Sequence, residues 1–449
     1  MSGIAGINQP GEKIAVKKML ERISYRGNAG RDIRENGNST LGIVCAEAQT
    51  DSLVRMRQKN EVEDGADAGH FALVKASKDG MILKRDPLGV APLYYGENEE
   101  GAICFASEVK ALIGLCSEVK SVPPGCKSDG EQVESYFQLK NKELLTSDPE
   151  IVTKKLRQLL KRSIEKLITQ GDMIGSWLSG GLDSSTLAAL ASPFVEKIYT
   201  FSAGLEGSPD LEYARQVAGF INSKHHEVLV EFSDLLEVLP EVIFHLESFD
   251  AHLVRSSIMN FLVAKRTSEY VDEVLSGEGG DELFAGYHYL KTLERKNLPG
   301  ELIDITKRLH NTALQRVDRS ASAHGIVAHV CFLDPEVVNY ALRIPPELKL
   351  HNNVGKWVLR EAMDGELPEA ILNRKKVKFW KGTGLGEMMS DYANQTITDN
   401  DFKLEHKLKN GWTINSKEEL MYYRIFEEYF GELEDLSWMG RTKVVASMH

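Results

Sequence analysis

Short runs of alternating apolar and polar residues fill the first third of the chain. The runs LGIVCAE, HFALVKAS, MILKRD, PLYYG and AICFAS are each of strand length and are bounded by Gly, Asp or Pro. This pattern predicts a β-rich N-terminal half. Pro, Gly and Asp concentrate in residues 121–131, and residues 140–150 are polar. We therefore expect one domain over residues 1–145 and a second over residues 146–449.

The apolar spacing changes after residue 145. Apolar residues first recur every three or four positions, as in an amphipathic helix, at Ile151, Leu156, Leu159, Leu160, Ile164 and Leu167. Strand-like segments at 173–178, 197–203 and 226–231 are then separated by the helical patterns STLAALA and LEYARQVAGFI. Such alternation predicts a parallel sheet with crossover helices. After residue 287 the pattern is mostly helical.

Composition and charge narrow the class of protein. The chain has 449 residues, 42% of them hydrophobic, and a formal net charge of −12. The acidic balance argues against nucleic acid as a partner, and the uncharged stretches are too short for a membrane span. Five cysteines without a CxxC pair favour a reducing compartment and are expected to be small core residues. We expect a soluble, cytoplasmic protein.

The segment Met173–Ser185 joins an apolar strand to a helix through the loop SGGLDSS. Its glycines let the backbone approach a phosphate, and its serines and the helix N-terminus offer donors. The residues concerned are Ser179, Gly180, Gly181, Ser184 and Ser185. Asp183 would repel a phosphate unless a divalent cation lay between them, which indicates Mg²⁺. The alternative is an ordinary tight turn with a helix cap.

A second loop, SGEGGDELFAGY at 276–287, also follows an apolar strand end. Ligands of open parallel sheets gather beyond the carboxyl ends of the strands, so the two loops are expected to share a site. Asp281 is a natural partner for Asp183 on magnesium, and Glu278 is placed to act as a general base. The pair His225–His226 is expected to open a strand rather than bind a metal.

Five segments together resemble the synthetase domain of the asparagine synthetases, over roughly residues 150–440. They are SGGLDSS, SGEGGDELFAGY, DRSASAHGIVAHVCFLD, GKWVLREAM and RKKVKFWKG. The resemblance implies an ATP pyrophosphatase fold (adenine nucleotide alpha hydrolase-like), with ATP and Mg²⁺ as cofactors. It adds Leu205 and Gly277 to the ATP-binding and pyrophosphate-binding residues of the first loop.

Roles for single residues follow from the same resemblance. Asp183 and Asp281 match the magnesium-binding aspartates, and Glu278 matches the glutamate that helps deprotonate the attacking nitrogen. Lys376 aligns with the lysine that neutralises the phosphate and the charged intermediate. Arg255 matches an arginine that holds the substrate carboxylate. His252, which we expect to bind the substrate together with Arg255, stands where the family usually has threonine. His329 also departs from the pattern, and both histidines are expected near the substrate pocket.

The N-terminal half resembles the glutaminase domain of that family, which is of the N-terminal nucleophile type. MSGIAG, Arg26–Gly27, RDPLGVAPLYYG and FASEVKAL carry the resemblance. The family nucleophile is a cysteine, whereas this chain has Ser2, and a hydroxyl is the weaker nucleophile. No glutamine-binding segment is recognisable between Asp32 and Gly69. Natural loss of glutaminase activity is favoured over an engineered serine or a serine that still works.

Three functions remain in play. The first is an enzyme that adenylates the side-chain carboxylate of aspartate, releases pyrophosphate and lets ammonia displace AMP to give asparagine. The second is a specialised amide or lactam synthetase acting on another carboxylate, and His252 and His329 favour this function. The third is a non-catalytic regulatory relative. In the favoured case, glutamine is a doubtful nitrogen donor, and the N-terminal half is structural or supports a homodimer.

Overall fold

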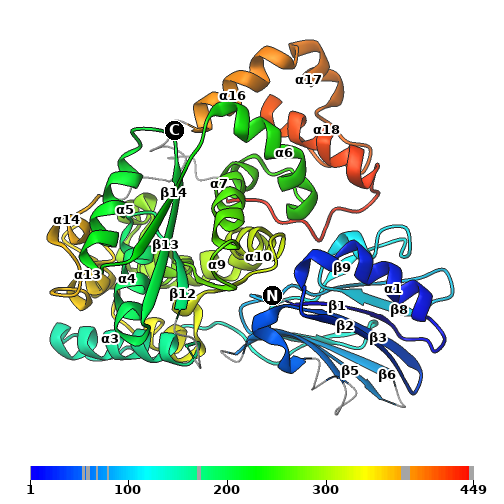
Figure 1. The fold of residues 1–449 in the computed structure, drawn as a ribbon, viewed down its shortest axis with the longest axis horizontal. Helices are drawn as coiled ribbons and strands as arrows, with labels where there is room; N and C mark the ends of the chain where they lie inside the picture. The colour runs from blue at the N-terminus through cyan, green and yellow to red at the C-terminus, as the bar shows by residue number, and fades with distance from the viewer. Residues whose placement is uncertain are drawn as a thin grey trace.

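Two structurally different halves make up the chain in this computed structural model (Figure 1). The structure describes residues 2–52, 56, 61–66, 69–77, 80–168, 173–375 and 385–443. The predicted β-rich N-terminal half and the predicted parallel sheet are both confirmed. Lys376 lies outside the described residues.

The N-terminal half contains two antiparallel sheets. The first has the strand order β2-β3-β1-β8-β7-β9, with bounds Gly30–Asn36, Ser39–Cys45, Gly3–Ile7, Ile103–Ala106, Tyr94–Glu97 and Lys120–Ser121. The second has the order β11-β10-β6-β5-β4, with bounds Val133–Ser135, Cys126–Ser128, Gly80–Arg85, His70–Ser77 and Glu61–Ala66. Helix α1 (Lys13–Arg22) packs on β1 and β3. It buries Val16, Met19 and Leu20, which share one helix face.

The second half is built on a five-stranded parallel sheet of order β14-β13-β12-β15-β16. The bounds in that order are Lys224–Leu229, Lys197–Gly204, Met173–Trp177, Glu273–Leu275 and Val327–His329. The chain runs outward from β12 through β13 to β14, and then returns to the other side of β12 with β15. Ligand sites of open sheets form where the strand order reverses in this way. Here that point lies between the loops after β12 and β15.

Helices surround this sheet and continue to the C-terminus (Figure 1). Those between the strands are α4 (Leu182–Ala191), α5 (Pro209–Phe220), α6 (Phe232–Leu246), α7 (Ala251–Thr267), α8 (Gly280–Leu283), α9 (Leu298–Lys307) and α10 (Ala313–Ser322). α3 (Pro149–Glu165) precedes the sheet. The later ones are α11 (Pro335–Ala341), α12 (Pro346–Lys349), α13 (Trp357–Ala362), α14 (Glu369–Leu372), α16 (Leu385–Thr396), α17 (Asp399–Glu405) and α18 (Lys417–Phe430).

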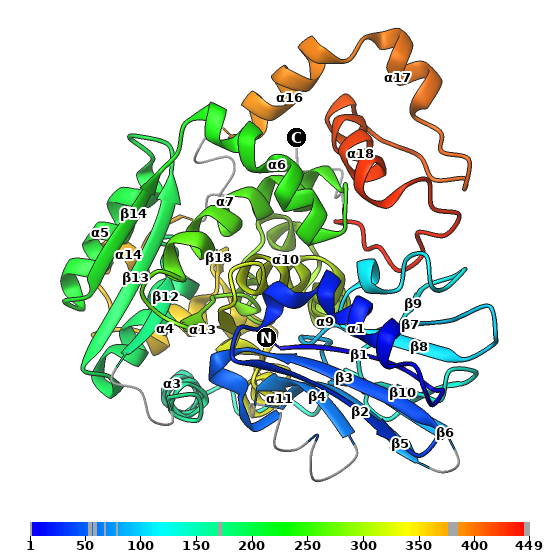
Figure 2. The same cartoon turned by 45° about the vertical axis from the view of Figure 1, so that its right-hand side comes forward.

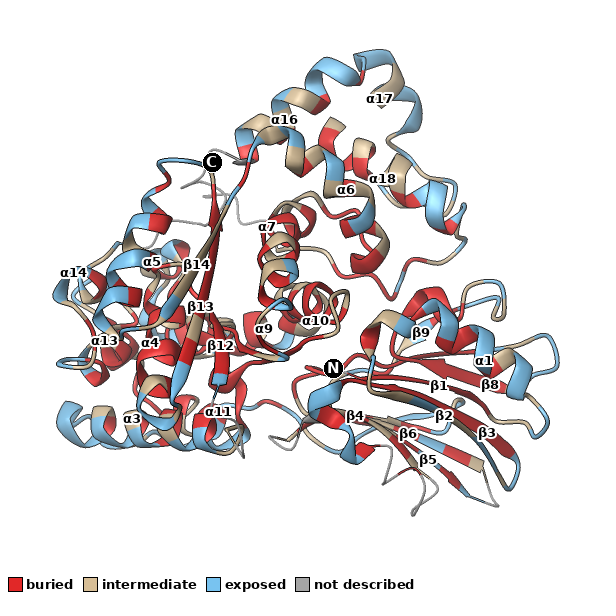
Figure 3. Ribbon diagram, viewed as in Figure 1, coloured by how far each residue is buried: buried red, intermediate tan, exposed pale blue. Residues whose placement is uncertain are grey.

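Burial follows from the sequence pattern of each element. Every residue of α4 except Asp183 is buried, since the helix packs against β12, α3 and α5 (Figure 3). α3 buries a stripe that includes Leu156, Leu160 and Ile164 and exposes its basic face.

β14 begins at Lys224, two residues before the predicted strand, so that His225 and His226 lie inside it. In the described part of the chain, no helix is long and apolar enough to cross a membrane.

A buried group of charged side chains joins the two halves, which we call the interface charge cluster. It comprises Arg26, Asp64, Glu108 and Lys110 from the N-terminal half and Glu247, Asp318 and Arg319 from the second half. Figure 2 shows α10, which carries Asp318 and Arg319, beside the N-terminal sheet. Arg26 is within 2.8 Å of Asp318 and 2.7 Å of Glu108. Buried charges are tolerated when each is paired, and the cluster therefore fixes how the halves meet.

Two carboxylates of this cluster hold their protons differently. Burial raises the pKa of Asp64 to about 6, although Arg26 opposes the shift. Burial also acts to raise the pKa of Asp318, but the charges of Arg26 and Arg319 outweigh it and lower that pKa. Asp64 thus favours the folded state most in its protonated form, whereas Asp318 favours it as the anion.

Replacing these two carboxylates should give opposite pH dependences. The pKa of Asp64 is raised from 3.8 to about 6 on folding, so its contribution to stability is complete below pH 4 and is lost as the pH rises through 6. Asparagine mimics the neutral acid. As the pH rises from 4 to 7, the free energy of unfolding of Asp64→Asn should therefore increase by up to about 3 kcal/mol relative to that of the parent protein. Urea unfolding across this range measures the gain.

The matched control is Asp318→Asn, which removes the partner of a buried arginine. Its free energy of unfolding should be lower than that of the parent protein by about 3 kcal/mol or more at pH 7, and this difference should shrink as the pH falls. Equal stability changes for the two variants at every pH would contradict the assignment.

Candidate active site

The loops after β12 and β15 open into one large cleft of about 1650 Å³. Among the predicted residues, those that line it are Ser179, Gly181, Asp183, Ser184, His252, Arg255, Gly277, Glu278 and Asp281. Ser185 is instead fully buried within α4, and Gly180 and Leu205 are not among the described residues that line the cleft. The two motifs therefore meet, as the order of the strands requires.

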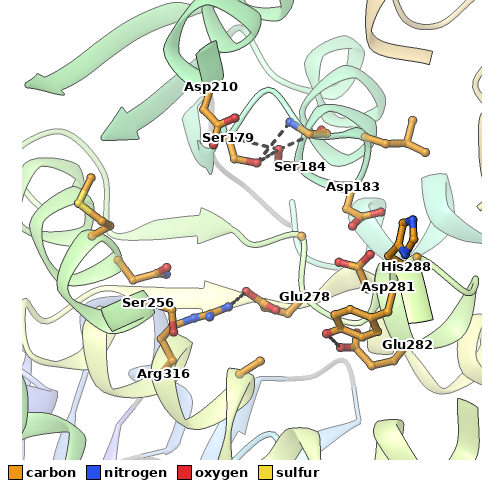
Figure 4. Close-up of a pocket in the computed structure, with 18 of the residues that line it drawn as sticks. Ser179, Asp183, Ser184, Asp210, Ser256, Glu278, Asp281, Glu282, His288 and Arg316 are labelled. Carbon is orange, nitrogen blue, oxygen red and sulfur yellow. Dashed lines mark hydrogen bonds and ion pairs between the residues drawn. The ribbon is translucent and has the colours of Figure 1, made fainter. Parts of the chain in front are cut away.

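The first loop is shaped by a glycine and by its own serines. Gly180 has φ +65°, and a Cβ there would lie 2.7 Å from the backbone nitrogen of Ala214, so no other residue fits without strain. The Ser179 backbone N–H donates to Ser184 Oγ at 3.2 Å, and the two hydroxyl oxygens are 3.0 Å apart (Figure 4). The loop is thus pre-formed, and α4 presents its N-terminus to the cleft.

Arg374 holds this loop from the other side. Its guanidinium donates to the Ser179 carbonyl oxygen at 3.2 Å, pairs with Asp210 at the start of α5, and lies 4.1 Å from the centre of the Tyr213 ring. Burial raises the pKa of Asp210, although the arginine works against the shift. Arg374 is therefore a positioning residue for the loop.

The second loop packs directly on the first. A Cβ on Gly277 would lie 2.9 Å from the backbone nitrogen of Ser184, and one on Gly280 would lie 2.5 Å from Asp183 Cγ. At Gly277 a larger residue would meet backbone, and at Gly280 it would displace the Asp183 carboxylate. The close contact brings Asp281, at the start of α8, next to Asp183 (Figure 4).

Lys356 lies between these two aspartates. Its Nζ pairs with Asp183 and is 2.6 Å from Asp281 Oδ1. Burial acts to lower the pKa of Lys356, but the two carboxylates outweigh it, and the pKa is raised. The residue has φ +58°, an uncommon backbone conformation for a side chain of this size. The site therefore concentrates negative charge and already holds one cation.

The donors at this point suit magnesium. Two carboxylates that converge on a cation are the hard oxygen ligands that Mg²⁺ prefers. Within the described ranges, no group of three His, Cys, Asp or Glu side chains could hold a metal ion. The two carboxylates of Asp183 and Asp281 would therefore hold Mg²⁺ together with phosphate oxygens and water.

Two further carboxylates of the site are each paired with an arginine. Glu278 forms an ion pair with Arg316 of α10, and both side chains are about one-fifth exposed (Figure 4). Arg255 of α7 is held by Glu418 at the start of α18 through two hydrogen bonds, and the Tyr422 hydroxyl donates to the same carboxylate at 2.8 Å. Burial acts to lower the pKa of Arg255, but Glu418 outweighs it and raises that pKa.

Two other predicted residues lie away from the cleft. Ser2 is fully buried in the N-terminal half, where its carbonyl oxygen accepts a hydrogen bond from Arg26 at 2.9 Å. The expectation that His329 lies near the substrate pocket is wrong. In the pairing of β16 with β15, His329 lies opposite Leu275, and its ring Nε2 is 2.9 Å from Oε1 of Glu273, two residues earlier on β15. His329 is not among the described residues that line the cleft.

Sequence reasoning missed Lys356, Arg316, Arg374 and Glu418. Lys356 and Arg374 are within segments that carry the family resemblance, so their position in GKWVLREAM and RKKVKFWKG was the available signal. Nothing in the spacing along the chain pointed to Glu418, which reaches Arg255 from a helix that lies far along the sequence.

Comparison with known proteins agrees with this geometry. The family model described as "Asparagine synthase" matches residues 155–304 and 294–447, and the one described as "Glutamine amidotransferase domain" matches residues 61–175. "Asparagine synthetase [glutamine-hydrolyzing] 2" of Arabidopsis thaliana is 35% identical over 387 residues, which cover 80% of this chain and 66% of that protein. "Asparagine synthetase B [glutamine-hydrolyzing]" of Escherichia coli (strain K12) is 33% identical over 80% of this chain and 69% of that protein.

These matches define a ligase-type fold that carries an amidotransferase-like half. The chain belongs to the asparagine synthase family. It spans about two thirds of the length of the curated relatives that it matches.

The contact between the two loops predicts that Gly280→Ala will weaken the binding of Mg·ATP by at least about tenfold. The added methyl group would displace the Asp183 carboxylate from its position beside Asp281. Calorimetric titration with Mg·ATP measures the loss.

Gly300→Ala is the matched control, because a Cβ at this position in α9 meets no atom within 4 Å. It should bind Mg·ATP normally and be more stable by about 0.5–1 kcal/mol, since alanine is the better helix former. Equal affinity in the two variants would show that the close approach of the loops does not serve the ligand.

Proposed function

We propose that this chain is an ATP-dependent amide synthetase that makes asparagine from aspartate and ammonia. It would adenylate the side-chain carboxylate, release pyrophosphate, and let ammonia displace AMP. The observation that carries this proposal is the meeting of Asp183, Asp281 and Lys356 in one cleft with Glu278. Phosphate chemistry and proton transfer to or from a nitrogen nucleophile both have residues there. Within this proposal, residues 1–145 and 146–449 are the two domains.

Pyrophosphate release requires that the charge on the leaving group be stabilised. The N-terminus of α4, the loop serines and Lys356 all face the part of the cleft where a triphosphate would lie. Mg²⁺, when bound by Asp183 and Asp281, would neutralise the phosphate oxygens as charge develops. Donors already in place lower the barrier because they need no reorganisation during the reaction. The proposed role of Lys376 in the same step is an extension of the family resemblance.

The carboxylate substrate would bind near Arg255. This side chain lines the cleft, and Glu418 fixes the position of its guanidinium group. His252 lies one helical turn earlier on α7 and also lines the cleft. Its presence beside Arg255 is the observation that favours a second candidate, the synthesis of another amide or of a lactam from a different carboxylate.

The nitrogen step would use Glu278. Ammonia that attacks the acyl-adenylate must lose a proton as the C–N bond forms, and a carboxylate in the cleft can accept it. The ion pair with Arg316 holds the Glu278 carboxylate in place within the cleft. We propose free ammonia as the nitrogen donor, because Ser2 replaces the expected cysteine.

A substrate panel tests the choice of carboxylate. Aspartate should give the fastest exchange of labelled pyrophosphate into ATP among aspartate, glutamate, β-alanine derivatives and N-acylated amino acids. AMP formation with aspartate should then require ammonium, and glutamine should support it at a few per cent of that rate or less. A different carboxylate as the best stimulant would replace the first candidate by the second.

Glu278→Gln separates adenylation from amide formation. Loss of a general base costs about 10²–10⁴-fold, so ammonium-dependent amide formation should fall by at least 100-fold. Exchange of pyrophosphate into ATP should change much less, because that half-reaction needs no base for nitrogen. Glu294→Gln, at an exposed position outside the cleft lining, is the control and should leave both rates unchanged. A parallel loss of both rates in Glu278→Gln would assign this residue to adenylation instead.

A further inference from the structure

The side chain of Gln49 covers the hydroxyl group of Ser2. Pairing of β1 with β3 places Gly3 opposite Val44, which brings Ser2 next to the turn (Glu47–Gln49) that follows β3. Gln49 Oε1 is 2.8 Å from Ser2 Oγ and 2.6 Å from Ser2 N. The backbone N–H of Ala46 donates to Ser2 Oγ at 3.3 Å. Ser2 has no exposed surface, and Gln49 is 7% exposed.

We propose that Gln49 is an internal pseudo-substrate that closes the N-terminal half to free glutamine. Its side chain ends in the same carboxamide group that an amidotransferase nucleophile must meet in glutamine. With this group bound against Ser2, a free glutamine can reach position 2 only if the Gln49 side chain leaves. This inference rests on the proposed function. Its consequence is that the ammonia used in the synthetase cleft does not come from glutamine hydrolysis by the N-terminal half.

The backbone that carries Gln49 is held independently of the carboxamide. Cys45 Sγ donates to the Gln49 carbonyl oxygen at 2.8 Å, so the turn has its own anchor. The Gln49 Nε2 atom is buried, and within the described residues it has no hydrogen-bond partner. A buried amide nitrogen that lacks a partner is costly, so stability alone does not explain why this side chain is buried here. Removal of the carboxamide should leave the turn intact.

Closure by Gln49 and the weak nucleophilicity of serine are separate obstacles. Ser2→Cys would place a thiol at position 2 but leave the Gln49 side chain against it. This variant should therefore not give free glutamine access to position 2. Ser2→Cys combined with Gln49→Ala removes both obstacles. The single and the combined variant differ only at position 49, so their comparison tests the role of Gln49.

The probe is a diazoketone analogue of glutamine, which alkylates thiols. The thiol sulfur forms a bond to the diazo-bearing carbon, that carbon takes up the thiol proton, and N₂ leaves. Proteins whose intact mass confirms removal of Met1 are incubated with the probe, and the peptide that carries position 2 is quantified by mass spectrometry. The combined variant should be labelled at position 2 at least tenfold faster than Ser2→Cys alone, and free glutamine should slow this labelling.

Ser2→Cys with Gln132→Ala is the matched control, because Gln132 is an exposed glutamine of the same half. It should be labelled as slowly as Ser2→Cys alone. If circular dichroism shows that Gln49→Ala unfolds the domain, Gln49→Asn takes its place. The shorter side chain withdraws the carboxamide by one methylene group and should also speed labelling. Equal rates with and without the Gln49 substitution would overturn the proposal. Labelling needs no ATP or carboxylate, so its outcome is independent of amide synthesis.

Discussion

The cleft depends on the meeting of two carboxylates that would repel each other without a cation between them. Asp183 and Asp281 come from different loops, and Lys356 from a third segment supplies the positive charge that lets them approach. Such an arrangement is costly to bury unless the charges balance. The left-handed backbone conformation of Lys356 and the glycines at 277 and 280 occur together at the point where the two loops come into close contact. Folding and the proposed phosphate chemistry therefore depend on the same few residues.

Much of this architecture could be predicted from the sequence. Alternating strand and helix patterns between residues 173 and 231 identified the parallel sheet, because buried parallel strands and crossover helices have distinct periods. The short bounded runs of the first third predicted the antiparallel sheets for the same reason. The two glycine-rich loops predicted a shared site because both follow strands whose carboxyl ends lie at one edge of the sheet.

The partners of the site residues could not be predicted in the same way. Arg316 pairs with Glu278, and Glu418 pairs with Arg255, across distances along the chain that no local pattern encodes. His329 shows the converse error. A departure from the family pattern was interpreted as proximity to the substrate, whereas the pairing of β16 with β15 directs this side chain to Glu273. Tertiary contacts, rather than residue type, decided each case.

Helix α10 has two different tasks on two of its sides. Asp318 and Arg319 belong to the interface charge cluster, and Arg316, less than one turn away, is the partner of Glu278 in the cleft. A rigid helix cannot shift at one position and stay in place at the other. An N-terminal half without glutamine chemistry would thus still be retained during evolution, since it holds in place the helix whose Arg316 pairs with Glu278.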